Sequence, residues 1–215
     1  MTTLGQFSPK QEVYSIDESF LDLTGFDSFD LTEYGQRIRQ QVAQWVGLPV
    51  CVGFGLSKTL AKLSNHVAKK RPQYQGVFDF SRLSAEEQDE LLASIDAGEV
   101  WGIGRRLAER LAQRGIVTVK DLRDAEPKTL RREFSVVVER TVLELRGISC
   151  LSLEEVAQPK KEIISSRSFG QLVTDLGELR QAVASYAARA AEKLRRQHSV
   201  ASALQVFLQT NPRAT

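Results

Sequence analysis

The sequence predicts an α+β fold, because its hydrophobic pattern changes twice along the chain. Residues 12–93 alternate short apolar, strand-like runs with amphipathic stretches, which indicates a sheet with helices on one side. Residues 96–147 contain only short helical stretches, and residues 162–208 are typical of strand, helix and strand. We therefore expect a mixed region, an all-helical region and the first half of a further αβ domain.

The composition is that of an ordinary globular protein. The chain has 215 residues, of which 42% are hydrophobic and 26% are charged. No apolar run is long enough to cross a bilayer, and the N-terminus has no apolar secretion signal. The two cysteines, Cys51 and Cys150, are distant in sequence and make no disulfide framework. These features predict a cytoplasmic protein without a membrane partner.

Charge is unevenly distributed along the chain. Residues up to Gly104 carry a net charge of −5 and the residues after it carry +7, although the whole chain is only +2. An excess of Lys and Arg in one half predicts an anionic partner such as nucleic acid. The alternative is that these side chains only solvate helix faces.

Two adjacent carboxylates, Asp17 and Glu18, lie between the apolar runs Val13–Ile16 and Phe20–Leu23. Asp and Glu are poor strand formers, so we expect them at the tip of a β-hairpin. Two carboxylates held together repel each other unless a cation lies between them, and Mg²⁺ prefers such ligands together with substrate phosphates. The alternative is a solvated acidic turn.

Helix-start signals divide the rest of the sequence. An Asp, Ser or Thr can accept hydrogen bonds from the first backbone N–H groups of a helix. Such signals predict helices after Asp30, Ser57, Ser84, Thr118 and Asp175. Strands are expected at residues 50–55 and 76–80, and the polar residues 1–11 are expected to form a disordered lead-in.

The junction between the strand at residues 50–55 and the following helix is rich in lysine. Lys58 and Lys62 lie in the first turns of that helix. A helix N-terminus and ammonium groups both attract anions, so this junction is a candidate phosphate site. A solvated basic face is the alternative.

Residues Gly102 to Gly104, followed by a helix, are typical of a helix-hairpin-helix motif. Glycine lets backbone N–H groups approach a phosphate without a Cβ in the way. The following helix presents its positive end, and two arginines add charge. We therefore expect a DNA phosphate, and not the bases, to be held by Gly102, Ile103, Gly104, Arg105 and Arg106. A simple tight turn is the alternative.

The last part of the sequence predicts an incomplete domain. Residues 151–161 lack periodicity and are expected to form a tether. Strands are expected at residues 162–169 and 201–208, with a long helix between them that ends near Gln197. Two strands rarely form a stable sheet alone, so we expect this part to be poorly protected in solution.

Several strings resemble Y-family translesion DNA polymerases of the UmuC branch. Tyr14–Phe20 resembles the S-I-D-E-[AS]-[FY] palm motif, and Gly55–Lys62 matches a G-x-S-K-x-x-A-K stretch of that family. Further similar strings are Asn65–Lys70, Val100–Arg106, Ser166–Gly170 and Ser185–Leu194. The resemblance covers nearly the whole chain. It implies a palm at residues 12–95, a helix-hairpin-helix thumb at 96–150, the tether at 151–161 and an incomplete little finger at 162–215.

The resemblance implies DNA-directed DNA synthesis past template lesions in an SOS-type damage response. Asp17 and Glu18 would be catalytic residues that hold two Mg²⁺ ions, and Lys62, with Lys58, would contact the triphosphate of the incoming deoxynucleotide. Primer–template DNA, a UmuD-type accessory subunit, RecA and a sliding clamp are the partners that the resemblance implies.

Two parts of the family pattern are not found in this sequence. One is an N-terminal segment with the first metal-binding Asp, an F-Y-A-S-x-E string and the fingers, and the other is a C-terminal tail with the clamp peptide. We therefore expect a chain that is truncated at both ends and inactive alone. The alternative function is a non-catalytic DNA-binding fragment that uses only the helix-hairpin-helix.

Overall fold

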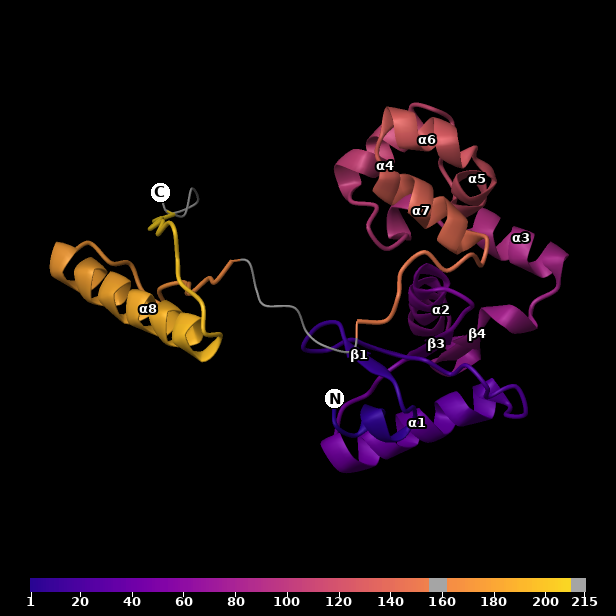
Figure 1. Cartoon of the computed structure of the whole chain (residues 1–215), viewed down its shortest axis with the longest axis horizontal. Helices are drawn as coiled ribbons and strands as arrows, with labels where there is room; N and C mark the ends of the chain where they lie inside the picture. Colours follow the sequence, from indigo (N-terminus) through magenta and orange to yellow (C-terminus); the bar gives the residue numbers. More distant parts are fainter. Residues whose placement is uncertain (155–161, 210–215) are drawn as a thin grey trace. The chain divides into compact units, whose positions relative to one another are not determined.

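The computed structural model of the chain has two compact units, Met1–Ala157 and Gln158–Thr215 (Figure 1). The structure describes residues 1–154 and 162–209. Helices and short strands are mixed in the first unit, which confirms the predicted α+β class. None of the helices within the described ranges is long and apolar enough to cross a membrane.

The first unit begins with the order of elements that the sequence predicts. Its mixed region (residues 1–95) contains β1 (Gln11–Val13), β2 (Ser19–Leu21), α1 (Leu31–Val46), β3 (Val52–Phe54), α2 (Lys58–Lys70), β4 (Val77–Asp79) and α3 (Ala85–Ala93). Short 3-10 turns cover Leu4–Gln6, Pro72–Tyr74 and Phe80–Arg82.

The predicted helix-start residues all cap helices. Each accepts a hydrogen bond from the backbone of the helix that it begins, at Asp30, Ser57, Ser84, Thr118 and Asp175. At Ser84 the interaction is reciprocal, because the Glu87 side chain also accepts from the Ser84 N–H. Local side-chain chemistry therefore sets the helix boundaries in both units.

The strands form two separate pairs rather than one sheet. β1 and β2 are antiparallel, with Glu12 opposite Phe20, whereas β3 and β4 are parallel, with Gly53 opposite Phe78. Val52 packs in the cluster of α1, and Phe78 packs in the cluster of α2, so the two helices cover opposite faces of the β3–β4 pair (Figure 1). The predicted layout with helices on one side is wrong in this detail, because both faces of a parallel pair need cover.

Residues 1–11 are folded, so the predicted disordered lead-in is wrong. Phe7 is 7% exposed and packs edge-on against Tyr34 of α1, with ring centroids 5.8 Å apart. The Tyr34 hydroxyl donates to Phe7 O at 2.6 Å, and Ser8 Oγ donates to Asp22 O at 2.5 Å. One buried aromatic ring anchors a segment whose average composition is polar.

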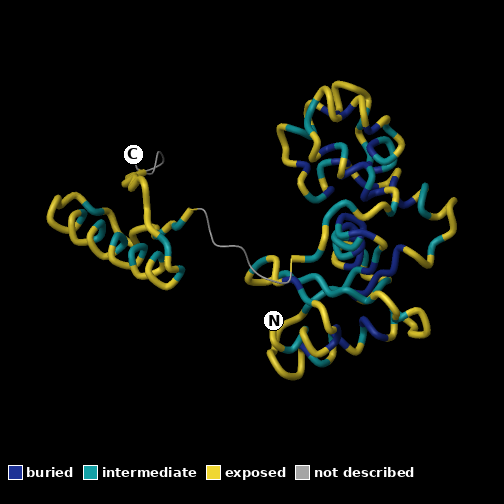
Figure 2. Tube along the Cα trace, in the orientation of Figure 1, coloured by how far each residue is buried: buried dark blue, intermediate teal, exposed yellow. Residues whose placement is uncertain are grey.

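The helical region (residues 96–150) completes the first unit. It contains the 3-10 turn Ala97–Glu99 and the helices α4 (Arg105–Ala112), α5 (Val119–Asp124), α6 (Pro127–Glu133) and α7 (Val136–Leu145). Leu60 of α2, Leu111 of α4 and Val142 of α7 belong to one core cluster. The first unit is therefore one packed body, and the buried segments of Figure 2 lie within it.

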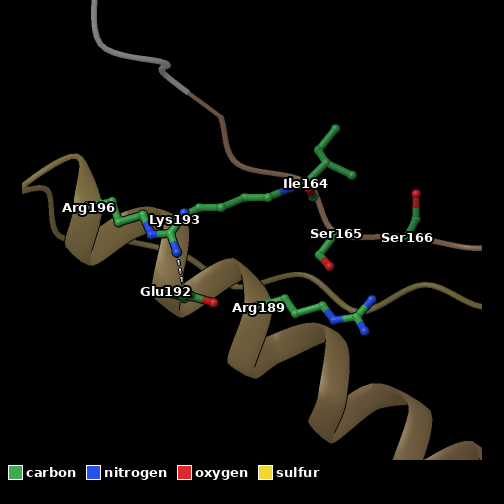
Figure 3. Close-up of a pocket in the computed structure, with 7 residues that line it drawn as sticks. All are labelled: Ile164, Ser165, Ser166, Arg189, Glu192, Lys193 and Arg196. Carbon is green, nitrogen blue, oxygen red and sulfur yellow. Dashed lines mark hydrogen bonds and ion pairs between the residues drawn. The ribbon is translucent and has the colours of Figure 1, made fainter.

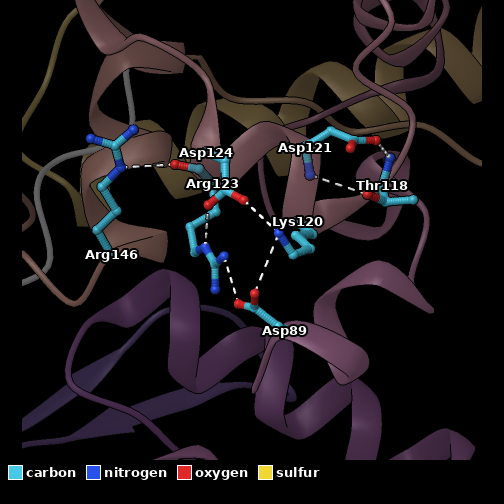
Figure 4. Close-up of polar contacts among 7 residues, drawn as sticks. All are labelled: Asp89, Thr118, Lys120, Asp121, Arg123, Asp124 and Arg146. Atoms are coloured by element: carbon cyan, nitrogen blue, oxygen red, sulfur yellow. Dashed lines mark hydrogen bonds and ion pairs between the residues drawn. The ribbon is translucent and has the colours of Figure 1, made fainter. Parts of the chain in front are cut away.

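A charge network ties α3 to α5 between the mixed and helical regions (Figure 4). Asp89 pairs with Arg123 at 2.7 Å and with Lys120 at 3.4 Å. Asp124 pairs with the same two cations at 2.7 and 2.9 Å. The hydrogen bond from Arg123 is the main cause that lowers the pKa of Asp124 to about 2. Arg146, directly after α7, donates to the backbone oxygen of Arg123 at 2.8 Å, so α5 is held from two sides.

The described part of the second unit contains the long helix α8 (Leu176–Arg196), as the sequence predicts. The strands expected at residues 162–169 and 201–208 are wrong, because both stretches lack strand structure. A strand needs a hydrogen-bonded neighbour, and no strand pairing forms among residues 162–209. Leu176 and Phe207 remain 61% and 63% exposed, so the apolar side chains here are poorly covered.

Candidate active site

The predicted carboxylates lie in the loop between β1 and β2, at residues 14–18. The backbone N–H groups of Tyr14 and Ser15 both donate to Glu18 O at 3.1 Å and close this loop. Ser15 Oγ donates to Asp17 Oδ1 at 2.6 Å. This hydrogen bond is the largest cause that holds the pKa of Asp17 below its ordinary value, so the exposed carboxylate is ionised at neutral pH.

Helix α2 brings Lys62 to this loop. Lys62 Nζ lies 2.5 Å from Glu18 Oε1, although the two residues are 44 positions apart in the sequence. The same ammonium lies 5.4 Å from the centre of the Tyr14 ring. The structure therefore brings together Glu18, a predicted metal ligand, and Lys62, a predicted triphosphate ligand.

A glycine in β3 allows the backbone of α2 to pack unusually close to the strands. A Cβ at Gly53 would lie 2.1 Å from Asn65 N and 2.6 Å from Ala61 O. Only glycine permits such a close approach of helix and strand backbones. This approach places the Lys62 turn of α2 within reach of the carboxylate loop.

Lys58 has different partners from Lys62. Its ammonium is bonded to the Glu12 carboxylate and donates to Ser152 O at 2.8 Å. It also lies 5.2 Å from the centre of the Phe20 ring, and its side chain is only 10% exposed. These contacts disfavour the predicted triphosphate role and indicate that Lys58 is a structural residue.

The segment after α7 is attached to the first unit, so its first residues are not a tether. Glu154 N donates to Glu12 Oε2 at 2.7 Å, beside the bond from Lys58 to Ser152 O. The predicted tether at residues 151–161 therefore starts too early. Its residues 155–161 lie outside the described residues.

Glu144 of α7 is a buried carboxylate that is not among the site residues predicted from the sequence. It is 0% exposed, and it accepts backbone hydrogen bonds from Thr59 at 2.9 Å, Cys150 at 2.7 Å and Leu151 at 3.1 Å. Its own backbone oxygen accepts from Ser57 Oγ at 2.7 Å. Glu144 thus caps α2 from another helix. No sequence signal indicates it, because its partner in the helix that it caps, Thr59, lies 85 positions earlier, and its other two partners lie in the irregular segment after α7.

The glycine hairpin precedes α4 as predicted. Gly102 has φ +87°, where only glycine is unstrained, and Gly104 is the N-cap of α4 without a side-chain cap. A Cβ at either glycine would meet nothing within 4 Å, so both backbones are approachable from outside. The first N–H groups of α4 have no intrahelical partner and are suited to bind an anion.

The residues around this hairpin divide into two groups. Arg105 and Arg106 are exposed, and Arg105 Nε lies 3.0 Å from Glu109 Oε1 on the same helix. Ile103 is only 5% exposed, and its N–H donates to Val100 O at 2.9 Å. The predicted phosphate contact by Ile103 is therefore wrong, because both its side chain and its N–H are used inside the fold.

The second unit has a basic pocket on one face of α8 (Figure 3). It is lined by Ile164, Ser165, Ser166, Arg189, Glu192, Lys193 and Arg196. Lys193 Nζ donates to Ile164 O at 3.1 Å, and Arg196 pairs with Glu192 at 2.5 Å. Three cations and one carboxylate line this pocket, so its charge is suited to an anion.

Asp17 and Glu18 are the candidate metal ligands. Both are accessible at the loop, and carboxylate oxygens are the ligands that Mg²⁺ prefers. Across residues 1–154 and 162–209, no group of three or more His, Cys, Asp and Glu side chains could hold a metal ion. The loop can therefore contribute two protein ligands, with substrate phosphates and water as further ligands.

Two family models match this chain. The model described as the impB/mucB/samB family matches residues 1–66, and that of the impB/mucB/samB family C-terminal domain matches residues 160–215. Protein UmuC of Salmonella typhimurium is 51% identical over 214 residues, which are 99% of this chain and 50% of the relative.

More distant similarities extend to DNA polymerases. DNA polymerase IV of Halobacterium salinarum is 29% identical over 210 residues, which are 97% of this chain and 49% of the relative. A solved Y-family DNA polymerase chimera of Dbh and Dpo4 is 27% identical with a TM-score of 0.58, and the match covers 74% of this chain and 45% of that one. The chain spans about half the length of the curated relatives that it matches.

Proposed function

Because the chain belongs to the impB/mucB/samB family, we propose that it carries part of the active site of a translesion DNA polymerase. The reaction is a nucleotidyl transfer. The primer 3′ hydroxyl gives up its proton to water and attacks the α-phosphorus of a deoxynucleoside triphosphate, so that a new P–O bond forms. The bond from the α-phosphorus to the bridging oxygen breaks, and pyrophosphate leaves with its electrons.

The pairing of Glu18 with Lys62 is the observation that carries this proposal. A metal ligand and a triphosphate ligand are expected side by side, because Glu18 would hold Mg²⁺, and the ion and Lys62 would both neutralise charge on the phosphates of the nucleotide. Lys62 Nζ is 2.5 Å from Glu18 Oε1. Two separate sequence motifs therefore meet at one place in the fold.

Each residue of the site has a separate task. Asp17 and Glu18 would hold Mg²⁺, which stabilises charge on the attacking and leaving oxygens when it is bound. Lys62 would turn from Glu18 to the triphosphate and neutralise it. The glycine hairpin and Arg105 and Arg106 would hold a phosphate of the primer–template duplex through backbone N–H groups and charge.

The broader cellular role is proposed on family grounds alone. Error-prone synthesis past lesions in an SOS-type response would require primer–template DNA and deoxynucleoside triphosphates. A UmuD-type subunit, RecA and a sliding clamp are the proposed protein partners of the whole polymerase.

A primer-extension assay with a chimera tests the proposal. Residues 1–215 replace the aligned half of the UmuC relative, and the chimera is assayed with Mg²⁺, all four deoxynucleotides and that relative's accessory proteins. We expect extension, and we expect Asp17→Ala or Glu18→Ala to reduce it at least about hundredfold, which corresponds to roughly 3 kcal/mol of transition-state stabilisation. The 215-residue chain by itself is expected not to extend a primer.

Asp27→Ala is the matched control, because Asp27 is an exposed carboxylate in the turn after β2. It should leave extension unchanged. Extension by the chimera that is indifferent to both Asp17→Ala and Glu18→Ala would contradict the site.

A DNA-binding module without catalysis is the second candidate function. The open approach to Gly102 and Gly104 is the observation that favours it. Such a module would bind duplex DNA with strong salt dependence, while no substitution in the carboxylate loop would change any activity of the chimera.

A further inference from the structure

Three aromatic rings join the carboxylate loop to the glycine hairpin. The Trp101 ring lies 5.3 Å from the Tyr14 ring in an edge-on arrangement and 5.7 Å from the Phe20 ring. The Tyr14 and Phe20 rings are 5.9 Å apart. Trp101 Nε1 donates to the Tyr14 hydroxyl at 3.1 Å, across 87 positions of sequence. We refer to these three residues as the aromatic cluster.

The aromatic cluster touches each functional part of the first unit. Tyr14 begins the carboxylate loop, and its N–H is bonded to the backbone oxygen of Glu18. The Tyr14 ring lies under Lys62, and the Phe20 ring lies under Lys58. Trp101 directly precedes Gly102 of the hairpin. A chain of direct contacts therefore runs from the hairpin to Glu18.

The carboxylate loop has few other anchors. Ile16 is 97% exposed, and the hydrogen bonds that Asp17 forms with the described residues are to Ser15, in the same loop. A short exposed loop with few contacts samples many conformations, and a metal must fix it at an entropic cost. Any contact that holds Tyr14 still would reduce this cost.

We propose that Trp101 is a positioning residue that couples the phosphate contact of the glycine hairpin to the carboxylate loop. The inference rests on the proposed function of both sites. A DNA phosphate held by the backbone at Gly104 fixes the hairpin, Trp101 fixes the Tyr14 ring, and Tyr14 restrains Glu18. Bound duplex then strengthens metal binding at Asp17 and Glu18, and metal strengthens duplex binding by the same factor.

Direct measurement of bound Mn²⁺ tests the coupling without relying on catalysis. Electron paramagnetic resonance counts Mn²⁺ bound to the whole 215-residue chain, with and without a short duplex. Mn²⁺ held by the DNA is subtracted with the Asp17→Asn/Glu18→Gln double variant. We expect the duplex to strengthen Mn²⁺ binding by at least about fivefold, at the lower end of usual coupling factors.

Three variants isolate the role of Trp101. Trp101→Leu should reduce the coupling below about twofold, while each ligand alone still binds. Trp101→Phe keeps a ring without the N–H donor and should be intermediate. Trp45→Phe is the matched control, because Trp45 lies on α1 with 56% exposure and outside the aromatic cluster, and it should keep the full coupling. Trp45 fluorescence reports whether Trp101→Leu is folded.

The outcomes separate this inference from the proposed function. A Trp101→Leu chain that is folded and keeps the fivefold coupling would show that the charge of the DNA alone attracts the metal, and it would overturn the inference. An unmodified chain that binds both ligands independently would also overturn it while leaving the proposed function intact. A chain that binds neither ligand would contradict both.

Discussion

The two units of this chain have equally clear helical patterns but very different cores. All buried residues among the described positions lie between Phe7 and Leu145, in the first unit. Residues 162–209 contain none. The difference lies in partners, because α2 packs on strands and on α7, whereas no strand forms among residues 162–209 to cover the apolar stripe of α8.

This contrast shows what a helix needs in addition to its own sequence. Both α2 and α8 begin with a side-chain cap, at Ser57 and Asp175. A cap adds about 1 kcal/mol, which does not stabilise an isolated helix by itself. Most helical stability in proteins comes from burial of the apolar face. The first unit should therefore be stable, and the second should be marginal.

Hydrogen exchange should give the largest difference between the units. We expect amides in the centre of α2 to exchange at least about thousandfold more slowly than those in α8, because α2 opens only when the first unit unfolds. A thousandfold difference in exchange rate corresponds to a difference of roughly 4 kcal/mol in the free energy of opening. Mass spectrometry of peptides from residues 58–70 and 176–196 measures this ratio.

Residues 201–208 serve as the internal comparison for that measurement. They have no strand pairing and should exchange nearly as fast as an unfolded peptide. Slow exchange across them in a monomer would contradict the view that the second unit lacks a core of its own.

The same contrast explains which features the sequence predicts. Local features are predicted well, such as the caps at Ser57 and Thr118. These depend on neighbours within four residues. The sequence also predicts strands at residues 162–169 and 201–208, but strand formation depends on a distant partner.

In the candidate site, too, local motifs are predicted from the sequence and contacts between distant residues are not. The sequence predicts Asp17, Glu18 and Lys62 through motifs, and the fold brings Glu18 and Lys62 together. It does not predict the buried Glu144, the pairing of Lys58 with Glu12 or the burial of Phe7. Each of these depends on contacts with residues that are distant in the chain.

Glu144→Ala should give the second largest effect, and only in the first unit. The variant leaves the N–H groups of Thr59, Cys150 and Leu151 without their buried acceptor, which should reduce the free energy of unfolding by about 3 kcal/mol. Tryptophan fluorescence during urea unfolding measures this loss, because both tryptophans, Trp45 and Trp101, lie in the first unit.

Glu86→Ala is the control for this substitution, because Glu86 is exposed on α3 and should change stability by less than about 0.5 kcal/mol. Glu144→Gln keeps one acceptor oxygen and should lie between the two. An unchanged urea midpoint for Glu144→Ala would show that the carboxylate does not support the first unit.

The effect of Gly104→Ala on duplex affinity tests whether the first unit holds a DNA phosphate. The backbone there has φ −77° and open space around it, so alanine is tolerated by the fold while its methyl group obstructs a phosphate. We expect duplex affinity to fall about tenfold, since a charge-assisted hydrogen bond contributes roughly 1.5 kcal/mol. Gly102→Val should be more severe because φ is +87°. Fluorescence anisotropy of a labelled duplex measures both.

Gly170→Ala provides the matched glycine of the second unit, where a Cβ also meets nothing within 4 Å. It should leave the affinity unchanged, whereas Arg189→Ala reports on the basic pocket of α8. The affinity of the unmodified chain should fall steeply between about 50 and 200 mM salt. A larger loss for Arg189→Ala than for Gly104→Ala would place the dominant contact in the second unit.

Asp124→Asn should give the smallest effect, and it should appear only in acid. The pKa of Asp124 is lowered from 3.8 to about 2, first by the hydrogen bond from Arg123, so its ionised form stabilises the folded first unit. A lowered pKa gives stability that is complete above the unfolded value of 3.8 and is lost as the pH falls through about 2. Asp124 is nearly half exposed, so this contribution should be under about 1 kcal/mol.

Urea midpoints measured by tryptophan fluorescence at several pH values between about 5 and 2 test this prediction. As the pH falls, the midpoint of Asp124→Asn should decrease less than the midpoint of the unmodified chain. Asp27→Asn is the control and should follow the unmodified chain. Equal slopes for all three proteins would show that the network between α3 and α5 is too well solvated to stabilise the first unit.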